Sequence, residues 1–206
     1  MSVVFINPPI LLAKTFAHYP MFSSLGMLSN AAFLRSRGVQ VEVADAFTAT
    51  DSLLIEPQPK GFRQVGCSIE ALCDAAQSAI QRCNDTPTLV VAVTMFSDLN
   101  RPSETLIAET VQALSNRFGC YKIGLADLYI CGMNYFPYDV EKTLRQIQEL
   151  SFILVGEGEP TLHKVIDRLS QGGSLDGLER LAYRRDDGEI VFNCTAPSSI
   201  QQLDSI

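Results

Sequence analysis

The 206-residue sequence contains no tryptophan, only two histidines and no run of lysine or arginine, and its formal net charge is −7. An acidic chain without a basic patch argues against binding to nucleic acid phosphates or to an anionic membrane surface. No apolar run approaches the roughly 18 residues that span a bilayer, and no basic segment precedes the apolar N-terminus as in a signal peptide. We therefore expect a cytoplasmic protein that contacts neither nucleic acid nor membrane.

The six cysteines follow no common metal or disulfide pattern. No two of them have CxxC spacing, and no cysteine–histidine cluster resembles a zinc site. We expect free and mostly buried thiols, as in a reducing cytoplasm. Motifs of nucleophilic and nucleotide chemistry are also missing: there is no GxSxG elbow, no P-loop and no GxGxxG after the first expected strand.

Apolar stretches and helical patterns alternate along most of the chain, and 47% of the residues are hydrophobic, which suits one packed domain. Ser68 stands where it would cap a helix, and Gly38 stands where one would stop. Five strand–helix alternations predict a doubly wound α/β fold with a parallel sheet and right-handed crossovers. The expected strands lie at 3–6, 39–44, 89–93, 128–131 and 152–155, the expected helices at 23–37, 69–80, 102–118, 139–150 and from 160 onward, and the expected loops at 10–22 and 46–66.

The C-terminal part of the chain changes character. Asp187-Gly188 lies between two short strand-like runs, Leu181–Arg184 and Ile190–Asn193, which is a strong β-hairpin signal. Residues 195–206 are polar and show no period. We therefore divide the chain into an α/β domain over 1–177, a hairpin over 178–194 and a tail or linker over 195–206.

Open parallel sheets bind ligands in the crevice outside the carboxyl ends of their strands, where the strand order reverses. Glycines after a strand let a ligand approach the backbone closely, and the free N–H groups that open the next helix can bind its polar atoms. Hydroxyl side chains there can face the crevice, and glutamates can accept hydrogen bonds from ribose. The segments at the expected strand ends are Asn7-Pro8-Pro9, Thr94-Met95-Phe96-Ser97, Gly132-Met133-Asn134 and Gly156-Glu157-Gly158-Glu159.

Each of these segments also has a purely structural interpretation. Gly156–Glu159 suits a tight turn with solvated carboxylates, and Gly132 suits close packing of a helix on the sheet. Thr94 and Ser97 suit caps or local turns. His18, in the expected first loop, can be read as a metal ligand or as an ordinary packed or surface histidine.

Three groups of residues form a more specific pattern along the chain. The first is Val3–Pro9 followed by Leu25–Leu28 and Leu34–Gly38. The second is Val155–Leu162, and the third is Leu178–Val191. In order and spacing they resemble the N-terminal cobalamin-binding domain of cobalamin-dependent radical SAM enzymes, and the resemblance covers nearly the whole chain.

This resemblance implies a flavodoxin-like (Rossmann-like) doubly wound sheet of five parallel strands with a C-terminal β-hairpin. It also implies a cobalamin whose nucleotide tail threads between the strand ends. Thr94 takes the place of the family's hydroxyl residue, and Gly132 takes the first place of its paired glycine, with Met133 at the second. The cofactor-binding residues that it implies are Asn7, Pro8, Pro9, Ser23, Leu25, Gly26, Thr94, Met95, Phe96, Ser97, Gly132, Met133, Asn134, Gly156, Glu157, Gly158 and Glu159.

One departure from the family concerns the cobalt. Many cobalamin domains carry DxHxxG, whose histidine ligates cobalt from below. When Gly26 is aligned with that glycine, Ser23 occupies the place of the histidine and Met21 that of the aspartate. The resemblance thus implies cobalamin without a lower histidine ligand, with His18 on the preceding loop as an alternative ligand.

A second departure concerns catalysis. Radical SAM chemistry needs a CxxxCxxC motif for its iron–sulfur cluster, and the sequence has no such spacing. We therefore expect this chain to carry cobalamin but no iron–sulfur cluster. It would depend on a radical SAM domain or protein, in cis or in trans, and would not catalyse radical methylation alone.

Three other interpretations stay open. A regulatory or interaction module that kept the fold and lost the cofactor is favoured by Met133 and by the missing histidine. A nucleotide- or flavin-binding domain is disfavoured because no phosphate-binding loop follows the first expected strand. A phosphoacceptor receiver domain needs carboxylates at the first strand end, where Asn7-Pro8-Pro9 offers none, and Asp98 lies past the third strand.

Overall fold

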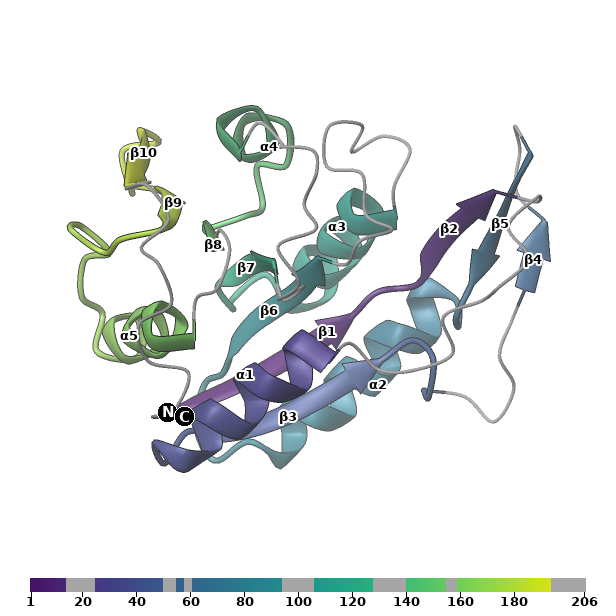
Figure 1. The fold of residues 1–206 in the computed structure, drawn as a ribbon, viewed down its shortest axis with the longest axis horizontal. Helices are drawn as coiled ribbons and strands as arrows, with labels where there is room; N and C mark the ends of the chain where they lie inside the picture. The colour runs from purple at the N-terminus through teal and green to yellow at the C-terminus, as the bar shows by residue number, and fades with distance from the viewer. Residues whose placement is uncertain are drawn as a thin grey trace.

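The computed structural model describes residues 1–13, 25–49, 55–57, 61–93, 106–127, 140–154 and 159–193. Its centre is a seven-stranded sheet in the order β10-β9-β8-β7-β6-β1-β3 (Figure 1). The strand order reverses between β1 and β6, as in doubly wound folds with the flavodoxin-like order. The strands that pair in parallel are β1 (Ser2–Asn7), β3 (Gln40–Asp45), β6 (Thr88–Val93), β7 (Ile123–Asp127) and β8 (Phe152–Leu154).

The predicted C-terminal hairpin is present and extends this sheet. Strand β9 (Leu181–Arg184) pairs antiparallel with β8, and β10 (Ile190–Asn193) pairs antiparallel with β9. The turn closes with a hydrogen bond from Arg185 N to Glu189 O of 2.8 Å, and Gly188 adopts a φ of 87°, which glycine tolerates without strain. Because the hairpin covers the exposed edge of β8, the sheet counts seven strands rather than five.

Helices cover both faces of the sheet and create two separate apolar layers. Residues of α1 (Leu25–Ser36) and α5 (Glu159–Ser170) pack in one layer, and those of α2 (Ile69–Arg82), α3 (Leu106–Phe118) and α4 (Val140–Gln146) in the other. Side chains of β1 alternate between them: Val3 and Phe5 face α1 and α5, whereas Val4 and Ile6 face the other helices. Within the described ranges, no helix is both long enough and apolar enough to cross a membrane.

The cap predicted for the second helix is confirmed. Ser68 precedes α2, and its Oγ accepts a hydrogen bond of 3.2 Å from the backbone N–H of Ala71. This bond satisfies one of the N–H groups that the first turn of any helix leaves without a partner. The predicted end of α1 is also confirmed, because Gly38 follows the helix with a φ of 80°.

Strand β7, at Ile123–Asp127, was not predicted from the sequence. The strand predicted at 128–131 lies outside the described residues. Gly124 explains why β7 was missed, because glycine is depleted in strands and lowers the strand propensity of this segment. The glycine is needed here because a Cβ atom at this position would lie 2.1 Å from Cζ of Phe152 on β8.

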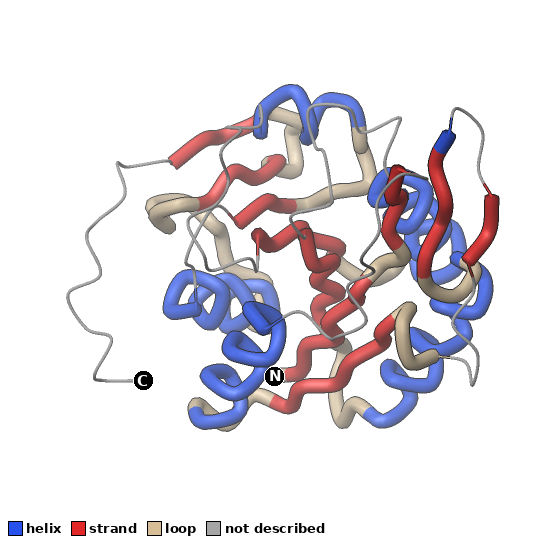
Figure 2. The backbone as a smooth tube through the Cα atoms, turned by 45° about the vertical axis from the view of Figure 1, so that its right-hand side comes forward, coloured by secondary structure: helices blue, strands red, loops and turns tan. Residues whose placement is uncertain are grey.

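A second sheet of three short strands occupies segments that were expected to be loops. It consists of β2 (Ile10–Ala13), β5 (Phe62–Val65) and β4 (Ile55–Pro57), all antiparallel. The chain passes directly from β1 through the buried Pro8 and Pro9 into β2, so the small sheet lies beyond the carboxyl end of β1 (Figures 1 and 2). Gly66, with a φ of 116°, follows β5 on the way to α2, and a Cβ atom there would lie 3.1 Å from Cβ of Pro9.

Candidate functional site

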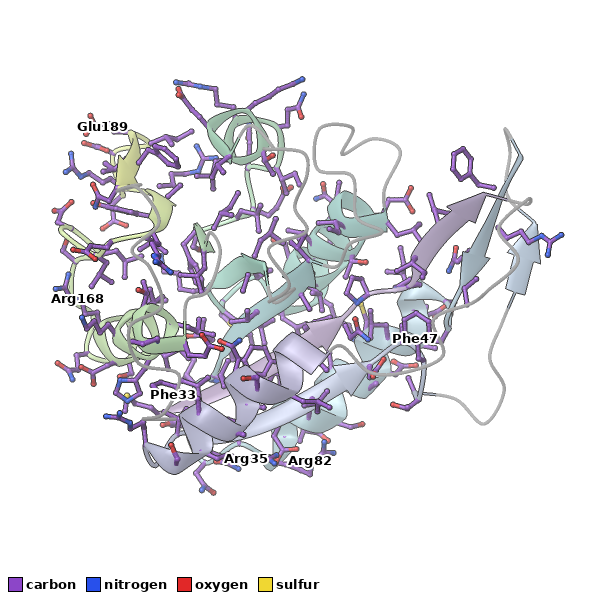
Figure 3. All side chains as sticks on the ribbon, in the orientation of Figure 1. Phe33, Arg35, Phe47, Arg82, Arg168 and Glu189 are labelled. Carbon is purple, nitrogen blue, oxygen red and sulfur yellow. The ribbon has the colours of Figure 1, made fainter. Side chains whose placement is uncertain are left out.

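The polar site begins at the carboxyl ends of two neighbouring strands, β1 and β3. Asn7 ends β1 and Asp45 ends β3, and the Nδ2 of Asn7 donates a hydrogen bond of 2.9 Å to Oδ1 of Asp45. Both side chains are buried, with 2% and 6% of their surface exposed. The same Asp45 oxygen accepts a 2.9 Å bond from the N–H of Phe47, whose side chain lies just beyond β3 (Figure 3). Asp45 therefore fixes both the turn after β3 and the amide of Asn7.

The amide oxygen of Asn7 has no hydrogen-bond partner although it is buried. The amide oxygen and nitrogen cannot exchange places, because Oδ1 of Asp45 already accepts from Phe47 N and a turned amide would place a second acceptor against it. By strand alternation, Asn7 lies on the same face as Val3 and Phe5, which is the face covered by α1 and α5. A buried polar atom without a partner costs about 1–3 kcal/mol, so it calls for an explanation such as a ligand.

Helix α1 contributes a second buried amide to this face. Asn30 lies among the apolar residues Met27 and Leu34 on the inner side of the helix and is 2% exposed. Its Nδ2 donates a 2.9 Å hydrogen bond to the backbone carbonyl of Gly26, one turn earlier. A carbonyl can only accept, so the orientation of this amide is also fixed, and its Oδ1 is buried without a partner.

Glu159 opens helix α5 on the same side of the sheet. Its side chain is 7% exposed, and the Oγ of Ser29 on α1 donates to its Oε1 across 3.4 Å. A carboxylate at the first residue of a helix is favoured by the positive end of the helix dipole. Because α5 follows β8, this end of the helix lies at the carboxyl edge of the sheet, where β1 and β3 also end.

Hydrogen-bond acceptors therefore gather at one end of one layer. Among the described residues, the buried amide and carboxyl side chains are these four and Gln64 of the small sheet. Each Nδ2 already donates one hydrogen bond, whereas each Oδ1 accepts none, so the polar atoms left without any partner are the two oxygens. The arrangement suits a ligand that brings N–H or O–H donors. The four residues are Asn7, Asn30, Asp45 and Glu159.

Cys67, beside this edge, is not suited to nucleophilic chemistry. It follows β5, its N–H donates a 2.7 Å hydrogen bond to the carbonyl of Ala46, and it is fully buried. Burial raises the pKa of its thiol to about 11, and the nearby charge of Asp45 raises the pKa as well. The thiol therefore stays protonated near neutral pH, whereas a nucleophile requires the thiolate.

Only part of the predicted site falls within the described residues. Asn7 and Glu159 belong to the acceptor cluster, and the carbonyl of Gly26 accepts the hydrogen bond of Asn30. Pro8 and Pro9 are buried in the link to the small sheet, and Leu25 begins α1. Outside the described residues lie Ser23, Thr94, Met95, Phe96, Ser97, Gly132, Met133, Asn134, Gly156, Glu157 and Gly158, together with the alternative cobalt ligand His18.

Sequence analysis missed two residues of the cluster, Asp45 and Asn30, and also Ser29, which donates to Glu159. Asp45 ends the second strand and could have been found by the rule that selected Asn7. Asn30 interrupts the apolar face of a helix, and a polar residue at a core position is itself a signal. Ser29 gave no such signal, because its contact with Glu159 spans 130 residues.

The strand order, the reversal beside β1 and the buried polar edge define a flavodoxin-like α/β domain with a candidate ligand site. No protein-family model matches the sequence, and no curated protein sequence matches it.

The fold is similar to solved structures of cobalamin-dependent radical SAM enzymes. One is OxsB with aqua-cobalamin and S-adenosylmethionine bound, at a TM-score of 0.60 and 17% identity over 96% of this chain and 22% of that chain. Another is the methyltransferase TsrM from Kitasatospora setae with cobalamin and an iron–sulfur cluster bound, at a TM-score of 0.60 and 13% identity over 94% of this chain and 30% of that chain. The predicted resemblance is thus confirmed for the fold, and this chain spans less than a third of either enzyme.

Proposed function

We propose that this chain binds cobalamin at the carboxyl edge of its sheet, as the cofactor-carrying domain of a radical SAM methyltransferase-type system. The observation that carries the proposal is a pair of buried, unpartnered amide oxygens. Asn7 ends β1, beside the point where the strand order reverses, and Asn30 lies on α1, which covers the same face of the sheet. The similarity to cobalamin-bound OxsB and TsrM supports the same ligand.

The described residues fit the chemistry of this cofactor. Cobalamin carries amide groups around its corrin ring and hydroxyl groups on the ribose of its nucleotide tail. These groups would supply N–H and O–H donors to the unpartnered Oδ1 atoms of Asn7 and Asn30. Asp45 holds Asn7 in place, and Glu159 adds a further acceptor beside Ser29. A ligand anchored mainly through phosphate would instead meet acceptors and negative charge here, which favours cobalamin over a nucleotide or flavin.

The remaining contacts of the proposal come from the family resemblance. Thr94 to Ser97, Gly132 to Asn134 and Gly156 to Gly158 would approach the cofactor from the other strand ends. Ser23 stands where a lower histidine would be, so the cobalt would have no histidine ligand from this position. Bound cobalamin would supply methyl-transfer or redox chemistry, and the protein would hold and shield it.

A radical SAM domain would have to complete the reaction. The sequence has no CxxxCxxC motif, so the iron–sulfur cluster would be contributed in cis or by a partner protein. The whole lengths of OxsB and TsrM, of which this chain spans 22% and 30%, are consistent with an arrangement in cis.

Cofactor retention tests the proposal directly. The purified protein is mixed with hydroxocobalamin in the dark and desalted, and its visible spectrum is recorded at several protein concentrations. We expect near-stoichiometric retention, with a spectrum in which the base of the nucleotide tail no longer ligates cobalt. Asn7→Ala should retain less corrin, whereas Asn84→Ala, at an exposed asparagine, should behave as the wild type.

Two outcomes would change the assignment. If the corrin elutes apart from a folded wild-type protein, the module that kept the fold and lost the cofactor becomes the better interpretation. If His18→Ala alters the spectrum of the bound corrin, His18 is a cobalt ligand after all. We expect that spectrum to stay unchanged.

A further inference from the structure

The two amides whose oxygens have no partner are each held in one orientation, and this limits which corrinoids can bind. Asn7 donates through Nδ2 to the carboxylate of Asp45, and Asn30 donates through Nδ2 to the carbonyl of Gly26. Neither partner can donate a hydrogen bond, so neither amide can flip without losing its bond and placing two acceptors face to face. Each amide therefore holds its unpartnered Oδ1 in a fixed orientation, and this atom needs a donor from a ligand.

The surroundings of the two amides also favour a ligand group that donates hydrogen bonds. Both asparagines are 2% exposed, so water cannot easily stand in for a missing donor. Two buried carboxyl side chains, Asp45 and Glu159, lie at the same edge of the same layer. A carboxylate brought by the ligand would meet acceptors and like charge, and it would lose its hydration without compensation.

We propose that Asn7 and Asn30 are specificity-determining residues that select corrinoids with amide side groups over corrinoids with carboxylates in the same places. This inference rests on the proposed cobalamin site. A primary amide donates two N–H bonds and is neutral, whereas the carboxylate that replaces it after hydrolysis donates none and is charged. The site thereby distinguishes a fully amidated corrinoid from a less amidated precursor or breakdown product.

The test compares hydroxocobalamin with the monocarboxylic acid derivatives made by mild hydrolysis of its propionamide groups. Each corrinoid is titrated against the wild-type protein near pH 7, and the dissociation constants are compared. We expect at least one derivative to bind about tenfold more weakly or worse, as for a buried hydrogen bond that is lost and replaced by charge. Derivatives whose altered group projects away from the two asparagines should bind like the parent compound.

Variants at the two asparagines connect the preference to these residues. A serine hydroxyl can donate as well as accept, so Asn30→Ser and Asn7→Ser should each reduce the preference for one amidated group. Ala32→Ser is the matched control, because Ala32 lies on the same helix as Asn30 but is exposed. It should leave the ratio of dissociation constants unchanged.

A further variant separates ligand recognition from structural support. Asn30→Leu removes a buried polar group with an unpartnered atom, so the melting temperature should stay level or rise. Its affinity for hydroxocobalamin should nevertheless fall by about tenfold. Asn30→Ala provides the same test if leucine proves too large for the site.

The outcomes separate this inference from the proposed function. If the wild type retains cobalamin but binds all derivatives within about twofold of the parent, the selectivity is wrong and the cobalamin site stands. If a preference exists but persists in both serine variants, these residues do not set it and the inference is overturned. If no corrinoid binds the folded wild type, the proposed function and this inference fail together.

Discussion

Gly124 of β7 lies directly against the ring of Phe152 on β8, so closely that a Cβ atom at residue 124 would lie 2.1 Å from the ring Cζ. Phe152 is fully buried, and the ring therefore has little room to move aside. Gly124→Ala should destabilise the fold by about 1–3 kcal/mol or more through overpacking. Urea unfolding monitored by circular dichroism measures this change.

A control and a rescue make the Gly124 prediction specific. Gly173→Ala should change stability little, because a Cβ there would meet its nearest neighbour at an ordinary 3.4 Å. Combining Gly124→Ala with Phe152→Leu should recover part of the lost stability. A fully stable Gly124→Ala single variant would mean that the ring does not occupy this place.

The cap of α2 predicts a smaller effect. Ser68→Ala removes the acceptor for the N–H of Ala71 and should lower the free energy of unfolding by about 1 kcal/mol. Ser78→Ala in the same helix is the control, since Ser78 is exposed and donates only to the carbonyl of Asp74. Denaturant titration of both variants should place Ser78→Ala at or above the wild type, and the reverse order would contradict the capping role.

Asp45 should connect stability to ligand retention. Asp45→Ala leaves the buried Nδ2 of Asn7 and the N–H of Phe47 without their acceptor, which should cost about 2 kcal/mol or more. Asp45→Asn keeps an oxygen that can accept these bonds and should cost less. Corrin retention should fall in the same order, because the orientation of Asn7 depends on this side chain. Equal retention by all three proteins would show that Asn7 needs no such support.

Asp176 should stabilise the fold at neutral pH and lose this effect in acid. Its carboxyl accepts hydrogen bonds from Tyr183 and from Arg185, the latter at 2.8 Å, and these bonds with that from Ser174 lower its pKa to about 2. Because the folded pKa is depressed, the stabilisation is present above the ordinary pKa near 4 and is lost as the pH falls toward 2.

Melting temperatures of wild type and Asp176→Asn should therefore differ near pH 7 and converge below pH 4. The neighbouring exposed Asp186 supplies a control, since Asp186→Asn should change the melting temperature less at pH 7. Arg168 and Glu189, labelled in Figure 3, belong to the same surface cluster: Arg168 bonds the backbone carbonyl of Asp176, and Glu189 pairs with Arg185. A difference that grows on acidification would contradict the assignment.

Local chemistry explains why much of the fold could be predicted. The alternation of strands and helices, the Ser68 cap, the stop at Gly38 and the hairpin turn at Asp187-Gly188 each depend on interactions between residues close in the chain. The rule that ligands bind at strand ends likewise selected Asn7 and Glu159, which both lie in the acceptor cluster.

Contacts between distant segments decided the rest. Residue 124 must be a glycine because the ring of Phe152 lies across from it, and the hairpin becomes part of the sheet because it pairs with the edge of β8. The small sheet likewise depends on β2 pairing with β5, some fifty residues later in the chain. None of these pairings is visible in a local pattern, because each requires the folded arrangement of its partner.

The candidate site was likewise predicted in part from local sequence and decided in part by contacts between distant residues. The sequence by itself determined the class of fold and the edge at which a ligand would bind, through periodicity, caps and turn chemistry. Only the tertiary structure brought Asn7 to Asp45 across 38 residues and Ser29 to Glu159 across 130, and only it left the oxygens of Asn7 and Asn30 buried without partners. Burial and the geometry of hydrogen bonds are properties of the packed chain, and they decide which atoms a ligand meets.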